Sequence, residues 1–305
     1  MNGIDEAALA LQGAPGWAAS EPIDLGPMPV WDLTDLYLGR QSKAVQDDLE
    51  RAAAEAQRIK QDYQGKLATL AGDGAALAEA IAAYESLSDT IGKLGSYAGL
   101  LYAADTSNTE HAKFYGDIQE KITAITTDLI FFELELNGID DAKLARALES
   151  PALARYRPWI DDLRKEKPYQ LDEKLERLLH EKAITSHAAW SRLFSETMTG
   201  LRFDVEGENE PLTLEPTLNF LLSPDGRKRQ AAAEGLAKAF KENARLFALI
   251  TNTLAKDKEI SDRWRGFKDV ADSRHLANRV EREVVEALVS AVREAYPRTA
   301  HRYYA

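Results

Sequence analysis

The amino-acid sequence predicts an all-α protein, built as an antiparallel array of helices with one short β-hairpin near residues 201–214. Apolar residues recur at steps of three and four over most of the chain, which is the period of a single helix face. Capping residues, glycines and prolines interrupt this period where helices typically begin or end. Only the stretch near residues 201–214 changes to the alternating period of a strand.

The first 30 residues differ from the rest of the chain. They contain four prolines together with several glycines and alanines. A segment of this composition cannot bury a core of its own. We therefore expect residues 1–30 to form a flexible or extended N-terminal arm.

Residues 31–199 are predicted to form an N-terminal helical domain. Its main helices are expected over residues 45–63, 77–101, 107–138, 172–183 and 186–198. The third is expected to begin with a capping box, in which Ser107 and Glu110 each satisfy a free backbone amide. Because the three long helices each carry an apolar face, we expect them to pack against one another as an antiparallel array.

Residues 200–305 are predicted to begin a second helical region. Leu201, Phe203 and Val205 alternate opposite Leu212 and Leu214 around a polar turn, which predicts the β-hairpin. A long helix over 233–254 follows, and another starts near residue 278 and is interrupted by a proline. The hairpin is therefore the expected boundary between the two helical regions.

The composition restricts the class of function. The net charge of the 305 residues is −12, from 38 basic and 50 acidic residues, so we expect no nucleic-acid partner. No apolar run approaches the ~20 residues of a membrane helix, so we expect no membrane association. The chain has no cysteine, which excludes disulfides, thiolate nucleophiles and Cys-ligated metals. An acidic N-terminus without signal-peptide character completes the prediction of a soluble, cytoplasmic protein.

The stretch LLHEKAITSHAAW resembles the start of the zinc-peptidase motif H-E-x-x-H. In that motif two histidines four residues apart on one helix reach the same zinc ion. Here His180 and Glu181 are followed by Ile184 at the second histidine position. His187 would lie about 10.5 Å further along a helix, too far to share a zinc ion with His180. We therefore predict no metal site in this stretch.

Other candidate residues also lack a catalytic pattern. His111, His275 and His301 show no ligand spacing, and the serine of GSYAG lies within a helical pattern rather than after a strand. Glu133 and Glu135 lie near an apolar face, where a solvated or paired role is favoured over a perturbed carboxylate. The sequence therefore predicts no catalytic residue and no metal ligand in this chain, and it leaves the substrate-binding residues unknown.

Five segments resemble oligoendopeptidase F, a branch of the thimet-oligopeptidase-like zinc metallopeptidases. They are WDLTDLYLG (Trp31–Gly39), LGSYAGLLYAADTSN (Leu94–Asn108), RPWIDDLRKEKPYQL (Arg157–Leu171), NARLFALITNTLAKDKEISDRWRGF (Asn243–Phe267) and SRHLANRVEREVVEALV (Ser273–Val289). They follow the family's order from about residue 30 to the last residue. The resemblance is to the N-terminal part of the family only.

The resemblance implies a helical peptidase that hydrolyses short peptides with a zinc-activated water and a glutamate general base. The family's zinc motif lies C-terminal of the matched segments, so the resemblance implies that the zinc ligands and the general base belong to a missing C-terminal part. Residues 200–305 would then be the truncated start of the peptidase domain, packed against that part, and the chain alone would be inactive. The alternative is a non-catalytic helical scaffold or peptide-binding module.

Overall fold

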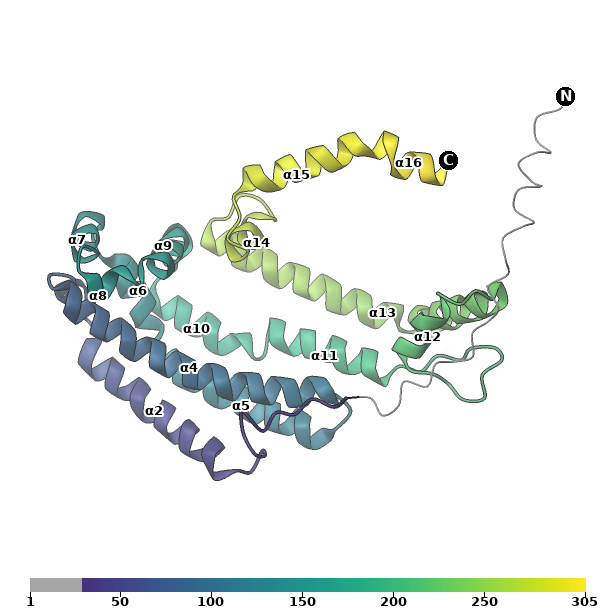
Figure 1. Ribbon diagram of the computed structural model, residues 1–305, viewed down its shortest axis with the longest axis horizontal. Helices are drawn as coiled ribbons and strands as arrows, with labels where there is room; N and C mark the ends of the chain where they lie inside the picture. The colour runs from purple at the N-terminus through teal and green to yellow at the C-terminus, as the bar shows by residue number, and fades with distance from the viewer. Residues whose placement is uncertain (1–28) are drawn as a thin grey trace. The chain divides into compact units, whose positions relative to one another are not determined.

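The computed structural model describes residues 29–305. The chain divides into two units, residues 1–33 and 34–305, and the description below concerns the second unit. Most of the predicted N-terminal arm, residues 1–30, lies outside the described residues. Helices make up most of the second unit (Figure 1), which confirms the predicted all-α class.

The first group of helices contains the main hydrophobic core. Its members are α2 (Lys43–Tyr63), α3 (Leu67–Leu70), α4 (Gly74–Ala104), α5 (Thr109–Thr127), α6 (Ile130–Gly138), α7 (Asp141–Ala147), α8 (Pro151–Ala154) and α9 (Arg157–Glu166). Helix α4 packs against α2, α5 and α8. One continuous cluster of buried apolar side chains reaches from Ala52 in α2 to Leu163 in α9. The predicted helices over 45–63 and 77–101 are therefore confirmed as α2 and α4.

The second group follows a short 3₁₀ helix. It contains η1 (Lys167–Tyr169), α10 (Glu173–Ala183), α11 (His187–Gly200), α12 (Leu214–Phe220), α13 (Gly226–Arg265), α14 (Asp272–Ala277), α15 (Arg282–Ala295), η2 (Tyr296–Arg298) and α16 (Ala300–Tyr304). A small cluster of Phe203, Leu236 and Ala239 is buried where α13 packs on the segment before α12. Within this described part of the chain, α10, α11, α14, α15 and α16 contain no buried residue.

The predicted β-hairpin is wrong. Phe203 and Leu212 exchange two backbone hydrogen bonds of 2.9 Å each, but this isolated antiparallel bridge is not extended into strands. Leu214, expected in the second strand, is instead the first residue of α12. The reason is local. Thr213 stands at the N-cap, and Pro216 lies in the first turn, where the backbone N–H that proline lacks would have no partner within the helix. These signals outweigh the alternation of Leu212 and Leu214.

The predicted helix over 107–138 is also corrected, because the structure forms two helices there. The N-cap of α5 is Asn108, whose side-chain oxygen accepts from the amides of Glu110 at 3.0 Å and His111 at 3.2 Å. Ser107, predicted to cap the helix, donates instead to Asp105 at 2.6 Å. The helix is interrupted at Asp128, whose carboxylate lies 2.6 Å from Lys60 Nζ of α2.

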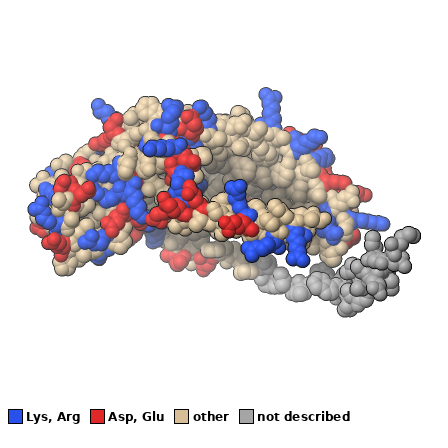
Figure 2. Space-filling model, turned by 90° about the horizontal axis from the view of Figure 1, so that it is seen from above, with Lys and Arg blue, Asp and Glu red and all other residues tan. Residues whose placement is uncertain are grey.

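The charged surface and the helix lengths complete the description of the second unit. Acidic and basic side chains are interspersed on the face shown in Figure 2, which is hollowed between areas of uncharged side chains. Within residues 29–305, every helix is too short or too polar to cross a bilayer. The division of the helices into domains at residue 200 stays a prediction.

Candidate functional site

The LLHEKAITSHAAW stretch is divided between two helices. His180 lies in α10, and His187 begins α11 after an interruption at residues 184–186. His180 Nε2 is 2.8 Å from the hydroxyl oxygen of Thr126 in α5, so its ring bridges two helices. Residues 29–305 contain no group of three or more His, Cys, Asp or Glu side chains placed to hold a metal ion. The prediction that this chain supplies no catalytic residue and no metal ligand stays a prediction.

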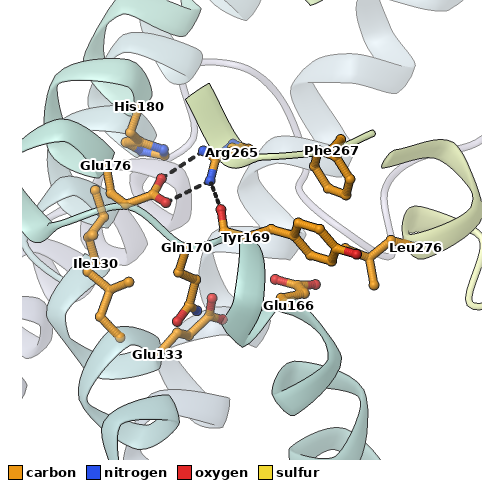
Figure 3. A pocket seen from close by; sticks show the side chains of 11 residues that line it. Ile130, Glu133, Glu166, Tyr169, Gln170, Glu176, His180, Arg265, Phe267 and Leu276 are labelled. Carbon is orange, nitrogen blue, oxygen red and sulfur yellow. Dashed lines mark hydrogen bonds and ion pairs between the residues drawn. The ribbon is translucent and has the colours of Figure 1, made fainter. Parts of the chain in front are cut away.

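A pocket of about 320 Å³ lies beside His180, between the end of the first helix group and the end of α13 (Figure 3). We call it the charged pocket because it contains Glu133, Glu166, Glu176 and Arg265. Its other lining residues are Ile130, Leu134, Tyr169, Gln170, His180, Phe267 and Leu276. Residues more than 100 positions apart in the sequence therefore meet in one cavity.

An ion pair between Arg265 and Glu176 crosses the charged pocket. Arg265 donates two hydrogen bonds to the two carboxylate oxygens of Glu176, at 2.7 and 2.8 Å, and a third to the backbone oxygen of Tyr169 at 3.1 Å. Burial alone would raise the pKa of Glu176, but the hydrogen bonds from Arg265 and the Leu171 amide outweigh it and lower the pKa. The same pair raises the pKa of Arg265. Both groups are therefore held in their charged forms.

Glu133 and Glu166 are the remaining carboxylates of the charged pocket, and neither forms a salt bridge within the described residues. Glu133 accepts a hydrogen bond of 3.0 Å from the Tyr84 hydroxyl, and Tyr84 is stacked on Phe132. Loss of water around the Glu166 carboxyl, and then repulsion by Glu133, raise the pKa of Glu166. Figure 3 shows both carboxylates on the same side of the pocket as Gln170.

Two aromatic rings close another side of the charged pocket. Tyr169 and Phe267 are stacked with ring centroids 4.0 Å apart and an interplanar angle of 14°. Tyr169 belongs to η1, whereas Phe267 follows Gly266, the left-handed residue that ends α13. The positive φ of 80° at this position favours glycine, and it turns the chain so that Phe267 reaches Tyr169.

A second cavity of about 530 Å³ adjoins the charged pocket. We call it the apolar groove, because Leu178 and Leu179 of α10 face Ile260 and Trp264 of α13 across it. All four side chains are among the exposed large hydrophobic residues, and Trp264 is 57% exposed. The two cavities share the lining residues Glu176, His180 and Arg265, so they lie next to one another.

Comparison with known proteins finds several that are similar in sequence to this chain. A sequence profile of the family described as Oligopeptidase F matches residues 135–203. Oligopeptidase PepF of Bacillus subtilis is 27% identical over 252 residues, which cover 80% of this chain and 36% of that protein. The chain is therefore similar in sequence to oligopeptidase F. An oligoendopeptidase F homolog of Borreliella burgdorferi is 22% identical over 220 residues, covering 72% of this chain and 37% of that protein.

The fold of this chain matches that of a solved structure. The crystal structure of oligoendopeptidase-F from Enterococcus faecium superposes with a TM-score of 0.74 at 22% identity. The superposition covers 86% of this chain and 52% of that one. The chain thus spans little more than a third of the length of the curated relatives it matches, and about half of the solved structure.

Sequence reasoning found only part of this site. It singled out Glu133 and Glu135 together, yet only Glu133 lines the pocket. Glu135 accepts hydrogen bonds from the amides of Gly65 at 2.6 Å and Leu67 at 3.4 Å, at the start of α3. The Glu176–Arg265 pair was missed, because 89 residues separate its members and no local spacing connects them.

Proposed function

We propose that this chain is the N-terminal part of an oligoendopeptidase F-like zinc metallopeptidase that hydrolyses short peptides in the cytoplasm. The observation that carries the proposal is the unequal coverage of the match. The similarity extends over 80% of this chain but over only 36% of PepF. The complete peptidase would therefore need a further C-terminal region, and this chain would supply part of the wall around the bound peptide.

The zinc ion implied by the family does not fit the described residues. His180 is hydrogen-bonded to Thr126, Ile184 stands where the second histidine of the motif would be, and His187 lies in the next helix. In our proposal the zinc ligands and the general base belong to the C-terminal region. The role left to this chain is to bind and orient the peptide and to pack against the catalytic region.

Helix α15 supports the proposed packing against a further region. Its apolar side chains lie at steps of three and four on one face, as in a helix that packs on a neighbour. They are nevertheless exposed in this chain: Val284, Leu288, Val289 and Val292, with Leu288 65% exposed. An apolar face of this kind typically marks an interface. We propose that the C-terminal region covers it.

The proposal is tested by the complete coding sequence. We expect the reading frame to continue beyond codon 305 and to encode an H-E-x-x-H motif. The complete product should cleave a mixed pool of short peptides, and a chelator should abolish the cleavage. Purified residues 1–305 should show no chelator-sensitive cleavage, with or without added zinc.

Two results would contradict the proposal. A stop codon directly after residue 305, with no separate gene for a catalytic half, would favour a non-catalytic scaffold or peptide-binding module. Chelator-sensitive turnover by residues 1–305 alone, comparable to that of a complete relative, would place the active site within this chain.

A further inference from the structure

We infer that the charged pocket and the apolar groove form one binding site for a short peptide that carries a primary ammonium group next to an apolar side chain. The ammonium group would bind at Glu133 and Glu166, and the apolar side chain would lie against Trp264. This inference deepens the proposed function and rests on it, because it names the chemical class of peptide that this chain selects.

The first argument is that the two cavities adjoin one another. Glu176, His180 and Arg265 line both of them, so the proposed peptide would pass these three side chains to reach from one cavity into the other. Their volumes of about 320 and 530 Å³ fall in the range of roughly 300–1,000 Å³ that small-ligand sites occupy. The site is therefore large enough for a few peptide residues.

The second argument is the uncompensated negative charge of the charged pocket. Arg265 is neutralised by Glu176 through two hydrogen bonds. Arg279, which also acts on Glu166, is paired with Asp162 at 2.8 Å. Glu133 and Glu166 thus remain as two carboxylates that repel each other and that form no salt bridge within residues 29–305. A ligand ammonium group would reduce this repulsion and donate hydrogen bonds to the two carboxylates.

The third argument is the contrasting chemistry of the apolar groove. Ile260 and Trp264 are four residues apart on α13, so they lie on the same helix face. Leu178 and Leu179 of α10 also line the groove. Exposed apolar area of this kind favours an apolar ligand group, because binding removes the apolar surfaces of both from water. A ligand with a positive charge at one end and an apolar group beside it matches both parts of the site.

Peptide binding by the full 1–305 chain tests the inference, with calorimetry as the measurement. The reference probe is the peptide Leu-Phe-Ala-Gly-Ala with an amidated C-terminus. Its N-acetylated form removes the ammonium group, and acetyl-Leu-Lys-Phe-Ala-Gly amide returns a primary ammonium on a lysine side chain. We expect the acetylated reference peptide to bind roughly tenfold more weakly than the free one, since charge-assisted hydrogen bonds are lost. Tight binding of the lysine peptide would identify the side chain, rather than the terminus, as a source of the ammonium group.

Variants locate the binding within the site. Glu166→Gln should lower the affinity for the free peptide roughly tenfold. It should change the affinity for the acetylated peptide little, because only the free peptide carries the charge that Glu166 compensates. Trp264→Ala should lower the affinity for both peptides by a similar factor, since both carry the same apolar side chains. Glu120→Gln on the exposed surface of α5 and Leu222→Ala before α13 are the matched controls and should leave binding unchanged.

Equal affinity for the free, acetylated and lysine peptides would overturn the inference, as would binding that survives both Glu166→Gln and Trp264→Ala. Absence of binding for all three peptides at millimolar concentration would overturn it as well. These outcomes are independent of the test of the proposed function. A complete enzyme that cleaves peptides while residues 1–305 bind none would retain the proposed function and remove only this site.

Discussion

Helices α2–α9 bury their apolar side chains against one another, whereas α10–α16 leave many of theirs exposed. Leu87 of α4 is fully buried, together with more than twenty apolar residues of the same cluster. Leu288 of α15 occupies an equally helical position but is 65% exposed. The two regions are therefore alike in secondary structure and different in packing. The first region has an extended hydrophobic core, and the second leaves large apolar side chains on its surface.

The largest difference between the regions should appear in matched leucine substitutions. Leu87→Ala leaves a cavity in the main core and should lower the free energy of unfolding by about 2–5 kcal/mol. Leu288→Ala should change it by less than about 0.5 kcal/mol, because alanine keeps the helix propensity and little buried area is lost. Denaturant unfolding followed by circular dichroism measures both. Equal costs would show that α15 is packed as tightly as α4.

A second, smaller effect on the free energy of unfolding should come from the hydrogen bonds between α9 and the end of α6. The Arg164 guanidinium of α9 donates to the backbone oxygens of Leu136 at 3.3 Å, Asn137 at 2.8 Å and Ile139 at 2.9 Å. It thus supplies hydrogen bonds to carbonyl groups at the C-terminal end of α6 and at its cap residue Ile139, where the amide donors of the helix run out. Arg164→Ala should lower the free energy of unfolding by about 2–3 kcal/mol.

Arg157→Ala is the control for this prediction. Arg157 begins the same helix but is exposed, so its loss should cost less than about 0.5 kcal/mol. If thermal unfolding of the two variants were indistinguishable, the bonds from Arg164 to the end of α6 would contribute nothing to the core.

The same comparison separates what the sequence could predict from what it could not. Helices such as α2 and α4 were predictable because each has a continuous apolar face that ends in a local signal. The hairpin at Phe203 and Leu212 failed because two short-range patterns competed there, and the helix start at Thr213 prevailed. Of the residues that line the charged pocket, only Glu133 and His180 had been singled out, Glu133 as a carboxylate near an apolar face and His180 in the incomplete zinc motif. The pairing of Glu176 with Arg265 depends on how α13 packs near α10, which no periodicity encodes.

The third prediction concerns the exposed face of α15. Purified residues 1–305 should self-associate, because an exposed apolar helix face is buried when two copies meet. Replacing both Leu288 and Val292 with Gln should weaken this self-association roughly tenfold, since two large apolar side chains leave the contact. Glutamine keeps the helix propensity and adds no charge.

Sedimentation velocity over a range of concentrations measures the effect on self-association. The matched control replaces Ala287 and Ala291, which are also four residues apart and exposed on α15, with Gln. This control should associate like the unchanged chain, since it adds polar groups without removing a large apolar side chain. If the chain without substitutions stayed monomeric at every concentration, the prediction would be contradicted.

The smallest effect should come from the ion pair between Glu176 and Arg265, which joins α10 to the end of α13. The pKa of Glu176 is lowered in the folded chain, from an ordinary value of about 4.3. Its contribution is therefore fully present above that ordinary value and is lost as the pH falls through the folded pKa. Because the pair is partly exposed, we expect a contribution of only about 1 kcal/mol at neutral pH.

Glu176→Gln should thus be less stable than the unchanged chain at neutral pH and equally stable once the carboxyl is protonated. Glu181→Gln, on the exposed side of the same helix, should follow the unchanged chain throughout. Denaturant midpoints across this pH range decide the matter: a constant difference between Glu176→Gln and the unchanged chain would mean that the charge of Glu176 does not hold α10 to α13.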